Sequence, residues 1–214
     1  MSTANEPAHA GSAWGALRRY VRRPSAEEHC ELCNKPLAAT HQHLLEPVHR
    51  KLICACDGCA ILFCSEGRTK YKRVPRRIRL LNHFQMTDSQ WDGLMMPINM
   101  ALFLKSTPQE RVIALYPSPA GATESLLSFD TWDEIERENP VLKEMEADVE
   151  ALLVNRIGYS RGFTQPEYYI APLDECFKLV GLIRSHWQGL SGGTGVWCEI
   201  GLFFGNLRER SHHG

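Results

Sequence analysis

The stretch EHCELCNKPLAATHQHLLEPVHRKLICACDGCAILF, residues 28–63, contains five of the eight cysteines of the chain. Cys30 and Cys33 form one C-x-x-C pair, and Cys56 and Cys59 form another, with 22 residues between the pairs. A C-x-x-C turn directs two thiolates at one ion, and a hairpin that brings a second such turn alongside completes a tetrahedron. The spacing therefore predicts a metal site with these four cysteines as ligands. Zinc is the expected metal, because four thiolates with no open position suit it best.

Other side chains in and just after this stretch leave the ligand set open. His41 and His43 are two residues apart, so on a strand they would share one face. We interpret them as hydrogen-bonding neighbours of the thiolates, with replacement of one thiolate or binding of a second metal as alternatives. Cys54 is a further neighbour or alternative ligand, and with Cys64 it raises the local thiols to six, which keeps an iron–sulfur cluster open. Iron bound by the four C-x-x-C thiolates, as in rubredoxin, is the alternative to zinc.

The composition is that of a soluble globular protein. Of the 214 residues, 43% are hydrophobic and 23% are charged. No apolar run approaches the roughly 20 residues that span a bilayer, and the N-terminal arginines are not followed by the apolar stretch of a signal peptide. We therefore expect a cytoplasmic protein with no membrane partner. Because cytosolic thiols are kept reduced, clustered cysteines there indicate metal ligands or redox groups before disulfides.

The net charge of −1 conceals a division along the chain. Residues 1–79 contain 14 Lys and Arg against 7 Asp and Glu, whereas nine acidic residues lie between Asp130 and Glu150. The run GRTKYKRVPRRIR (67–79) contains no acidic residue. It predicts either a face that attracts the acidic part of the same chain or a surface for an anionic partner, a protein in preference to a nucleic acid. The candidate partner-binding residues are Arg68, Lys70, Lys72, Arg73, Arg76 and Arg77.

The order of the predicted elements indicates an α+β fold. A small N-terminal zinc-ribbon-like module is expected to pack on a mixed α/β domain that ends in a C-terminal helical pair. Residues 1–27 are expected to form a flexible tail and a short basic helix. Residues 28–80 would form the cysteine module with its basic strand, and residues 81–214 the α+β domain.

Local patterns place individual elements in the second domain. Thr87 and Gln90 have the spacing of a capping box that begins a short helix. Asp174 is predicted to cap a later helix, and a further helix is expected to end the chain. The composition of residues 117–125 predicts a loop. Strands are expected from the apolar runs at 98–106, 111–118, 148–157 and 167–172. The cysteines of the C-terminal part are expected to be small buried residues: Cys176 and Cys198.

Six sequence blocks together resemble a known family. They are CELC (30–33), HQHL (41–44), LICACDGC (52–59), YPSPAGATES (116–125), DVEALLVNR (148–156) and DECFKLVGLIRSHWQGLSGG (174–193). In these motifs the chain is similar to an uncharacterised bacterial protein family that is often encoded beside NiFe hydrogenase genes. The resemblance implies a role in hydrogenase assembly or maturation, with a hydrogenase component as protein partner. This implication depends on gene neighbourhood and gives no mechanism.

Three functions are compatible with these observations. The preferred one is a non-catalytic zinc-binding accessory protein that binds a protein partner, since a closed four-thiolate site contributes folding energy and no chemistry. The first alternative is a rubredoxin-like iron protein that transfers electrons. The second is a divergent nuclease of the HNH type, which the order C-x-x-C, His43, Pro47, C-x-x-C resembles. The sequence departs from that pattern at Gln42 and at Ala60, where the family has an acidic residue and a further metal ligand.

Overall fold

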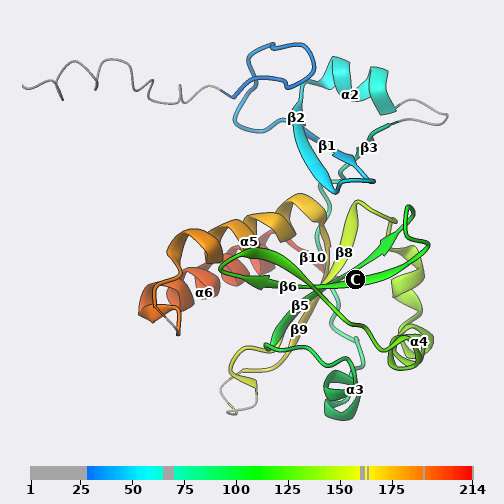
Figure 1. Cartoon of the computed structure of the whole chain (residues 1–214), viewed down its shortest axis with the longest axis vertical. Coiled ribbons are helices and arrows are strands. Elements are labelled where there is room, and N and C mark those ends of the chain that lie inside the picture. Colours follow the sequence, from blue (N-terminus) through cyan, green and yellow to red (C-terminus); the bar gives the residue numbers. More distant parts are fainter. Residues whose placement is uncertain (1–27, 65–69, 160–161, 163, 190, 214) are drawn as a thin grey trace, which may run out of the picture.

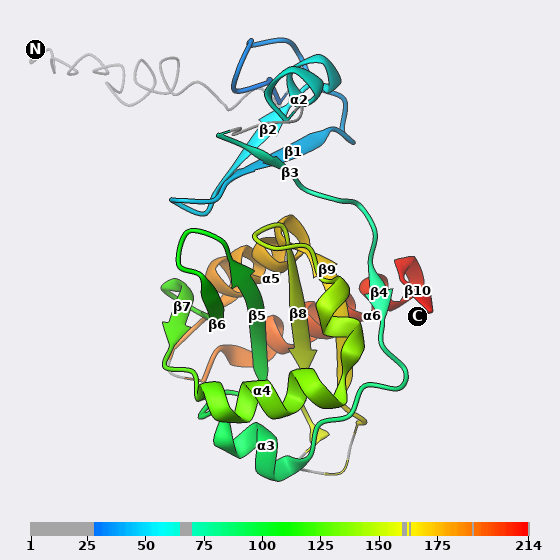
Figure 2. The same cartoon turned by 90° about the vertical axis from the view of Figure 1, so that its right-hand side faces the viewer.

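The residues described by the computed structural model form a small N-terminal sheet above a larger one (Figure 1). They are residues 28–64, 70–159, 162, 164–189 and 191–213. The predictions for residues 1–27 and for Arg68 lie outside these ranges. Both sheets carry helices, and two helices end the chain (Figures 1 and 2). This arrangement confirms the predicted α+β fold, with a cysteine module in front and a C-terminal helical pair.

The cysteine module comprises the described residues 28–64 and 70–74. Its strands are antiparallel and have the order β2-β1-β3. Both faces of β1 are used: Leu44 lies in the small core of the module, whereas Leu45 packs against the core of the larger domain. The central strand therefore joins the module to the rest of the protein. The elements are β1 (Gln42–Glu46), β2 (Lys51–Ala55), α2 (Asp57–Cys64) and β3 (Lys72–Arg73).

The larger sheet of the described residues has the strand order β10-β4-β9-β8-β5-β6-β7. Neighbouring strands are antiparallel except for β10 and β4, which are parallel. The chain enters this sheet at β4, so it crosses from the small sheet to the large one between Arg73 and Arg79. The strands are β4 (Arg79–Leu80), β5 (Met100–Ser106), β6 (Arg111–Ser118), β7 (Gly121–Ser125), β8 (Glu150–Asn155), β9 (Glu167–Pro172) and β10 (His212–His213).

Helices cover both faces of the larger sheet (Figure 2). Side chains alternate along β5, so that Met100, Leu102 and Leu104 face α5 and α6, whereas Ala101 and Phe103 face the opposite layer. No helix in the described part of the chain is long and apolar enough to cross a membrane. The helices are α3 (Asp88–Gly93), α4 (Phe129–Glu138), the 3₁₀ helix η1 (Pro140–Glu144), α5 (Leu173–His186) and α6 (Gly193–Arg210).

Most local predictions agree with these elements, and two are wrong. The capping box is present, because Thr87 Oγ1 accepts a hydrogen bond from Gln90 N–H while Gln90 Oε1 accepts one from Thr87 N–H. The loop predicted at 117–125 is wrong, since residues 121–125 form β7 and pair with β6. Asp174 does not cap α5. Pro172 occupies the N-cap position, and Asp174 lies in the first helical turn.

The module is attached to the domain by apolar contacts and ion pairs. Val74 and Ile78 join Leu45 in the core that α5 and α6 cover. Lys72 Nζ lies 2.5 Å from Asp148 Oδ2, and a carboxylate that is buried requires such a partner. The contacts come from the segment that links the two sheets and from β1. They fix which face of the module meets the N-terminal end of α5.

Candidate metal centre

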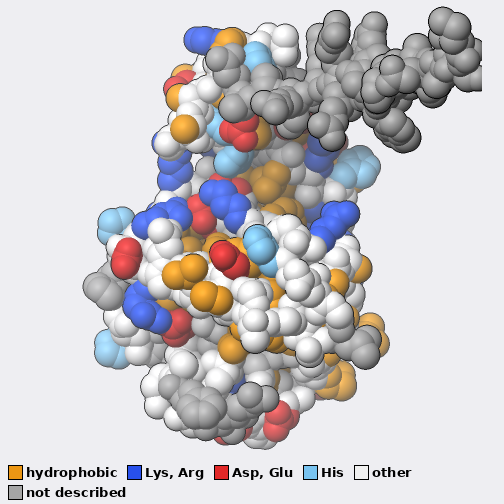
Figure 3. All heavy atoms as spheres, turned by 90° about the vertical axis from the view of Figure 1, so that its left-hand side faces the viewer, with side chains coloured by type: hydrophobic (Ala, Val, Ile, Leu, Met, Phe, Trp, Pro, Cys, Tyr) orange, Lys and Arg blue, Asp and Glu red, His pale blue; other side chains and the backbone are white. Residues whose placement is uncertain are grey.

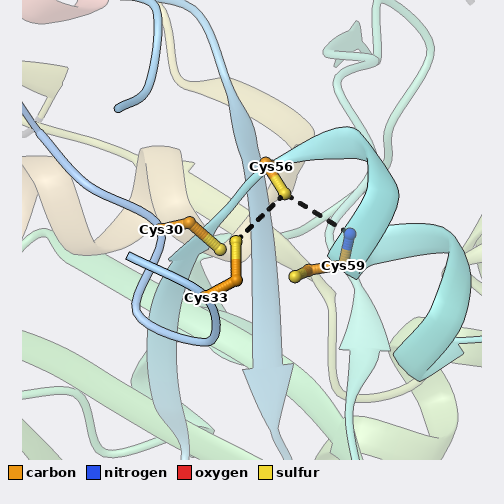
Figure 4. Close-up of side chains that lie close together, drawn as sticks. All are labelled: Cys30, Cys33, Cys56 and Cys59. Atoms are coloured by element: carbon orange, nitrogen blue, oxygen red, sulfur yellow. Dashed lines mark hydrogen bonds between the residues drawn. The ribbon is translucent and has the colours of Figure 1, made fainter. Parts of the chain in front are cut away.

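The first C-x-x-C pair lies on a tight turn before β1. Asn34 N–H donates to Cys30 O at 2.7 Å, and Cys30 N–H donates to Lys35 O at 2.8 Å. Asn34 has a φ of 61°, a left-handed conformation that Asn adopts more readily than most residues. The turn closes on itself and directs the side chains of Cys30 and Cys33 toward the second pair (Figure 4).

The second pair lies at the junction of β2 and α2. Cys56 follows the last residue of β2, and Cys59 lies in the first turn of α2. Cys59 N–H donates to Cys56 Sγ at 3.5 Å, so the helix N-terminus stabilises negative charge on that sulfur. Asp57 Oδ1 accepts a hydrogen bond of 2.9 Å from Gln42 Nε2, which fixes the start of α2 to β1. A strand-to-helix junction thus presents this pair, where a zinc ribbon would use a second turn.

The four sulfur atoms lie within 4.8 Å of one another, and their side chains converge on one point (Figure 4). Cys33 Sγ and Cys56 Sγ are 3.7 Å apart. None of the four forms a disulfide. Tetrahedral coordination with metal–sulfur bonds of about 2.3 Å places sulfur atoms roughly 3.8 Å apart, so the group has the size that one ion needs. The cluster therefore suggests a metal site, and its ligand set suits both zinc and iron.

The four thiols do not ionise equally. Burial raises the pKa of Cys30, but backbone N–H groups of Cys56, Leu32 and Cys33 outweigh this effect and lower the pKa to about 6. Burial and the neighbouring sulfur atoms raise the pKa of Cys59 to about 12. Thiolates this close together repel one another, so a bound cation is the group that allows all four to be ionised at once.

His41, His43 and Cys54 form a second group that shares no member with the first. Their potential ligand atoms also lie within 4.8 Å of one another. The two imidazole rings meet edge to face with centroids 4.8 Å apart, and His43 Nδ1 lies 2.7 Å from Asp174 Oδ2. The structure therefore brings these three residues together. It also places Asp174 beside His43. The two residues are 131 positions apart in the sequence, so no local pattern predicts this contact.

The described members of the basic run all contact acceptors in this chain. In the space-filling view, Lys and Arg side chains gather between the module and the larger domain, with carboxylates among them (Figure 3). The contacts of Lys72 and Arg77 agree with the first of the two interpretations of the run, a basic face that attracts the acidic region of the same chain, whereas the other three described candidate residues contact acceptors within the module. The contacts are Lys70 to Glu46, Lys72 to Asp148, Arg73 to Gln42, Arg76 to the carbonyl oxygen of His41, and Arg77 to Glu150.

The remaining cysteines are not members of either group. Cys64 is the last residue of α2 and belongs to neither set of potential ligands. Cys176 is fully buried in the core beneath α5, as predicted, and this burial raises the pKa of its thiol. The prediction for Cys198 is wrong, because this side chain is exposed on α6. The helix leaves it on the face turned away from the sheet.

A hollow of about 820 Å³ lies in the larger domain. Tyr116 near the end of β6 and Pro119 just after it line the hollow, together with Trp187, which follows α5, and Trp197 on α6. The lining is mainly apolar, as in pockets that hold small molecules. Part of the stretch 117–125, singled out in the sequence as a loop, therefore borders a cavity.

Comparison with known families accounts for nearly the whole of the described fold. Residues 29–211 match the model of DUF5947, a family of unknown function. Neither the comparison with curated proteins nor that with solved structures finds a match. The match supports membership of an uncharacterised family and shows no link to hydrogenases. The matched range contains both groups of potential metal ligands and both sheets except for β10, and on this basis the chain belongs to the DUF5947 family.

Proposed function

We propose that this protein is a non-catalytic accessory protein in which zinc fixes the cysteine module so that it can bind a protein partner. The observation that carries the proposal is the four-cysteine group, with four sulfur atoms within 4.8 Å of one another. Four thiolates fill a tetrahedral shell and leave no position for a substrate or water. Such an ion contributes folding free energy and a rigid surface, which is what an accessory protein needs.

Metal content tests the first half of this proposal. Protein purified without a histidine tag is expected to contain a tightly bound zinc ion, to be colourless, and to lose that ion in Cys59→Ser. Elemental analysis and a visible absorption spectrum make the measurement. Iron with thiolate charge-transfer absorption would instead support the rubredoxin-like alternative, in which the same four thiolates transfer electrons. Protein without a tightly bound metal would contradict both the zinc proposal and the iron alternative.

The partner surface is proposed to include α2 and its basic neighbours. Ile61, Leu62 and Phe63 are 66%, 73% and 44% exposed on this helix, which begins beside the metal ligands. The ring of Tyr71 meets Phe63 edge to face, and Lys70 lies above the ring of Tyr71. An exposed apolar patch beside a cation fits a protein with an apolar surface and an acidic rim. Of the basic residues predicted to bind a partner, Lys70 belongs to this surface, whereas Lys72 and Arg77 bind buried carboxylates of this chain.

A hydrogenase component is the first partner to test, because the sequence motifs resemble a family encoded beside NiFe hydrogenase genes. We expect tagged wild-type protein to co-purify with such a component from hydrogenase-producing cells. Leu62→Asp and Lys70→Glu are each expected to reduce its recovery about tenfold or more, the scale of a central interface residue. Leu126→Asp is the matched control, since Leu126 is an exposed leucine in the larger domain. If all three variants recover as much of the partner as wild type does, the partner-binding surface does not include Leu62 and Lys70.

A further inference from the structure

The second group of potential metal ligands lies where the module meets the larger domain. His43 and Cys54 are directly opposite each other on the antiparallel strands β1 and β2. Residues paired in this way point to the same face. His41, two residues before His43, belongs to the same face. Leu45, also on this face, packs into the core that α5 covers. The three side chains are therefore gathered by register on the side of the hairpin that meets α5.

His41 has a buried ring nitrogen without a partner. Its side chain is only 7% exposed. His41 Nδ1 lies 3.0 Å from the carbonyl oxygen of Ala38, with Glu28 Oε2 3.4 Å from the same nitrogen. Both of these oxygens accept hydrogen bonds, so Nδ1 carries the proton and the lone pair of the neutral ring is on Nε2. Among the described residues no group donates to that nitrogen. A buried acceptor without a donor destabilises the fold unless something else binds it.

His43 is oriented in the way that metal-binding histidines are. Its Nδ1 lies 2.7 Å from Asp174 Oδ2, and the other carboxylate oxygen of Asp174 accepts Glu175 N–H at 2.8 Å. A carboxylate on one ring nitrogen fixes the tautomer, raises the basicity of the ring and leaves the other nitrogen free to bind an ion. The first turn of α5 holds this carboxylate against the hairpin.

We propose that His41, His43 and Cys54 bind a divalent transition-metal ion of the zinc class, with Asp174 as the residue that positions His43. The ligands are one nitrogen of each imidazole and the thiolate of Cys54, whose proton passes to solvent on binding. Tetrahedral coordination at the usual bond lengths places such atoms roughly 3.3–3.6 Å apart. The separations here are at most 4.8 Å, so small side-chain rotations close the site.

Three protein ligands distinguish this site from the four-cysteine site. They leave the fourth tetrahedral position open to water or to an anionic ligand, as in zinc sites that exchange ligands. Because the ligands come from β1, the residue before it and β2, while the positioning carboxylate comes from α5, the ion would also connect the module to the domain. Edge-to-face packing of the two rings accounts for their contact but not for the orphan nitrogen of His41.

Metal stoichiometry tests this site in the full chain. After equilibration with zinc, wild-type protein is expected to contain two ions, and His41→Ala and Cys54→Ser one ion each. His49→Ala, which removes an exposed histidine from the β1–β2 turn, should retain two. Asp174→Asn is expected to retain the site with its affinity reduced about 10- to 100-fold, the usual effect of losing a carboxylate behind a ligand. Elemental analysis per chain is the measurement.

Cobalt provides a spectroscopic readout on the wild-type protein itself, with Cys54→Ser as its comparison. Cobalt added to wild-type protein that already holds one zinc ion is expected to give tetrahedral d–d bands and a thiolate charge-transfer band, and Cys54→Ser should lack the latter. A single ion in wild-type protein without these bands would overturn the proposal. So would two ions in the variant with all three ligands replaced. Cys59→Ser and Cys54→Ser remove different ions, so failure here is distinguishable from failure of the four-cysteine zinc site.

Discussion

Glu175 connects the two C-terminal helices through a carboxylate that is almost completely buried. Its side chain is 8% exposed. Oε1 accepts hydrogen bonds from Lys178 Nζ at 2.9 Å and from Arg210 Nη2 at 2.8 Å. Burial alone raises the pKa of this carboxyl group, but the hydrogen bonds from Arg210 and Lys178 outweigh burial and lower the pKa below its usual range. The charged form is therefore the one that the fold stabilises.

We expect Glu175→Gln to remove a stability contribution that depends on pH. Because the pKa is lower in the folded chain than in the unfolded chain, the contribution is complete above the unfolded value and is lost as the pH falls through the folded value. At neutral pH the variant should have the lower free energy of unfolding, and the difference from wild type should shrink below about pH 4. Urea unfolding followed by tryptophan fluorescence measures this, since Trp132 is buried in the larger domain. Glu209→Gln, an exposed position on α6, should show no such convergence.

Single residues were predictable where the chemistry is local. The spacing of Cys30, Cys33, Cys56 and Cys59 was sufficient to group them, because each pair needs only one short turn or junction to share an ion. The role of Asp174 was not predictable. It depends on the packing of α5 against β1, and a carboxylate in the first turn of a helix has an ordinary local explanation as a cap.

At the level of the elements, alternation and capping chemistry were good guides. The strand from 111 to 118 and the helix that starts at the Thr87 cap follow the patterns that predict them. β7 was missed, because Gly121, Thr123 and Ser125 are typical of loops and only their pairing with the edge of β6 makes them a strand. α2 was also missed. Its short DGCAILFC sequence has little helical periodicity. The C-x-x-C spacing of Cys56 and Cys59 is typical of a turn, and here it lies at the start of a helix.

For the whole molecule, the cysteine module and the larger domain differ in the size of their apolar cores. The module buries a few small side chains around Leu44 and Ile53, whereas the larger sheet is covered on both faces. Small domains of this kind need a metal or another link to remain folded. The module is therefore expected to depend on its metal while the larger domain does not.

Metal removal tests that difference. With a strong chelator at neutral pH, amide hydrogens of residues 42–64 should exchange much faster, because the metal-binding free energy that maintains the module is lost. Those of β5 and β8 should keep their protection. Hydrogen exchange measured by mass spectrometry resolves the two regions, and Cys198→Ser should behave as wild type because Cys198 lies outside both ligand groups. Equal loss of protection in both regions would mean that the chain unfolds as one cooperative unit.

The sequence by itself determined the α+β class, the grouping of the four cysteines and the positions of the four buried strands β5, β6, β8 and β9, since these depend on spacing and alternation over short distances. The tertiary structure decided how the two parts meet. Arg77 binds the buried carboxylate of Glu150 in β8, and Lys72 binds that of Asp148, two residues before this strand. His43 contacts Asp174 on α5. Contacts of this kind join residues 70 or more positions apart, and their geometry follows from packing that no local pattern encodes.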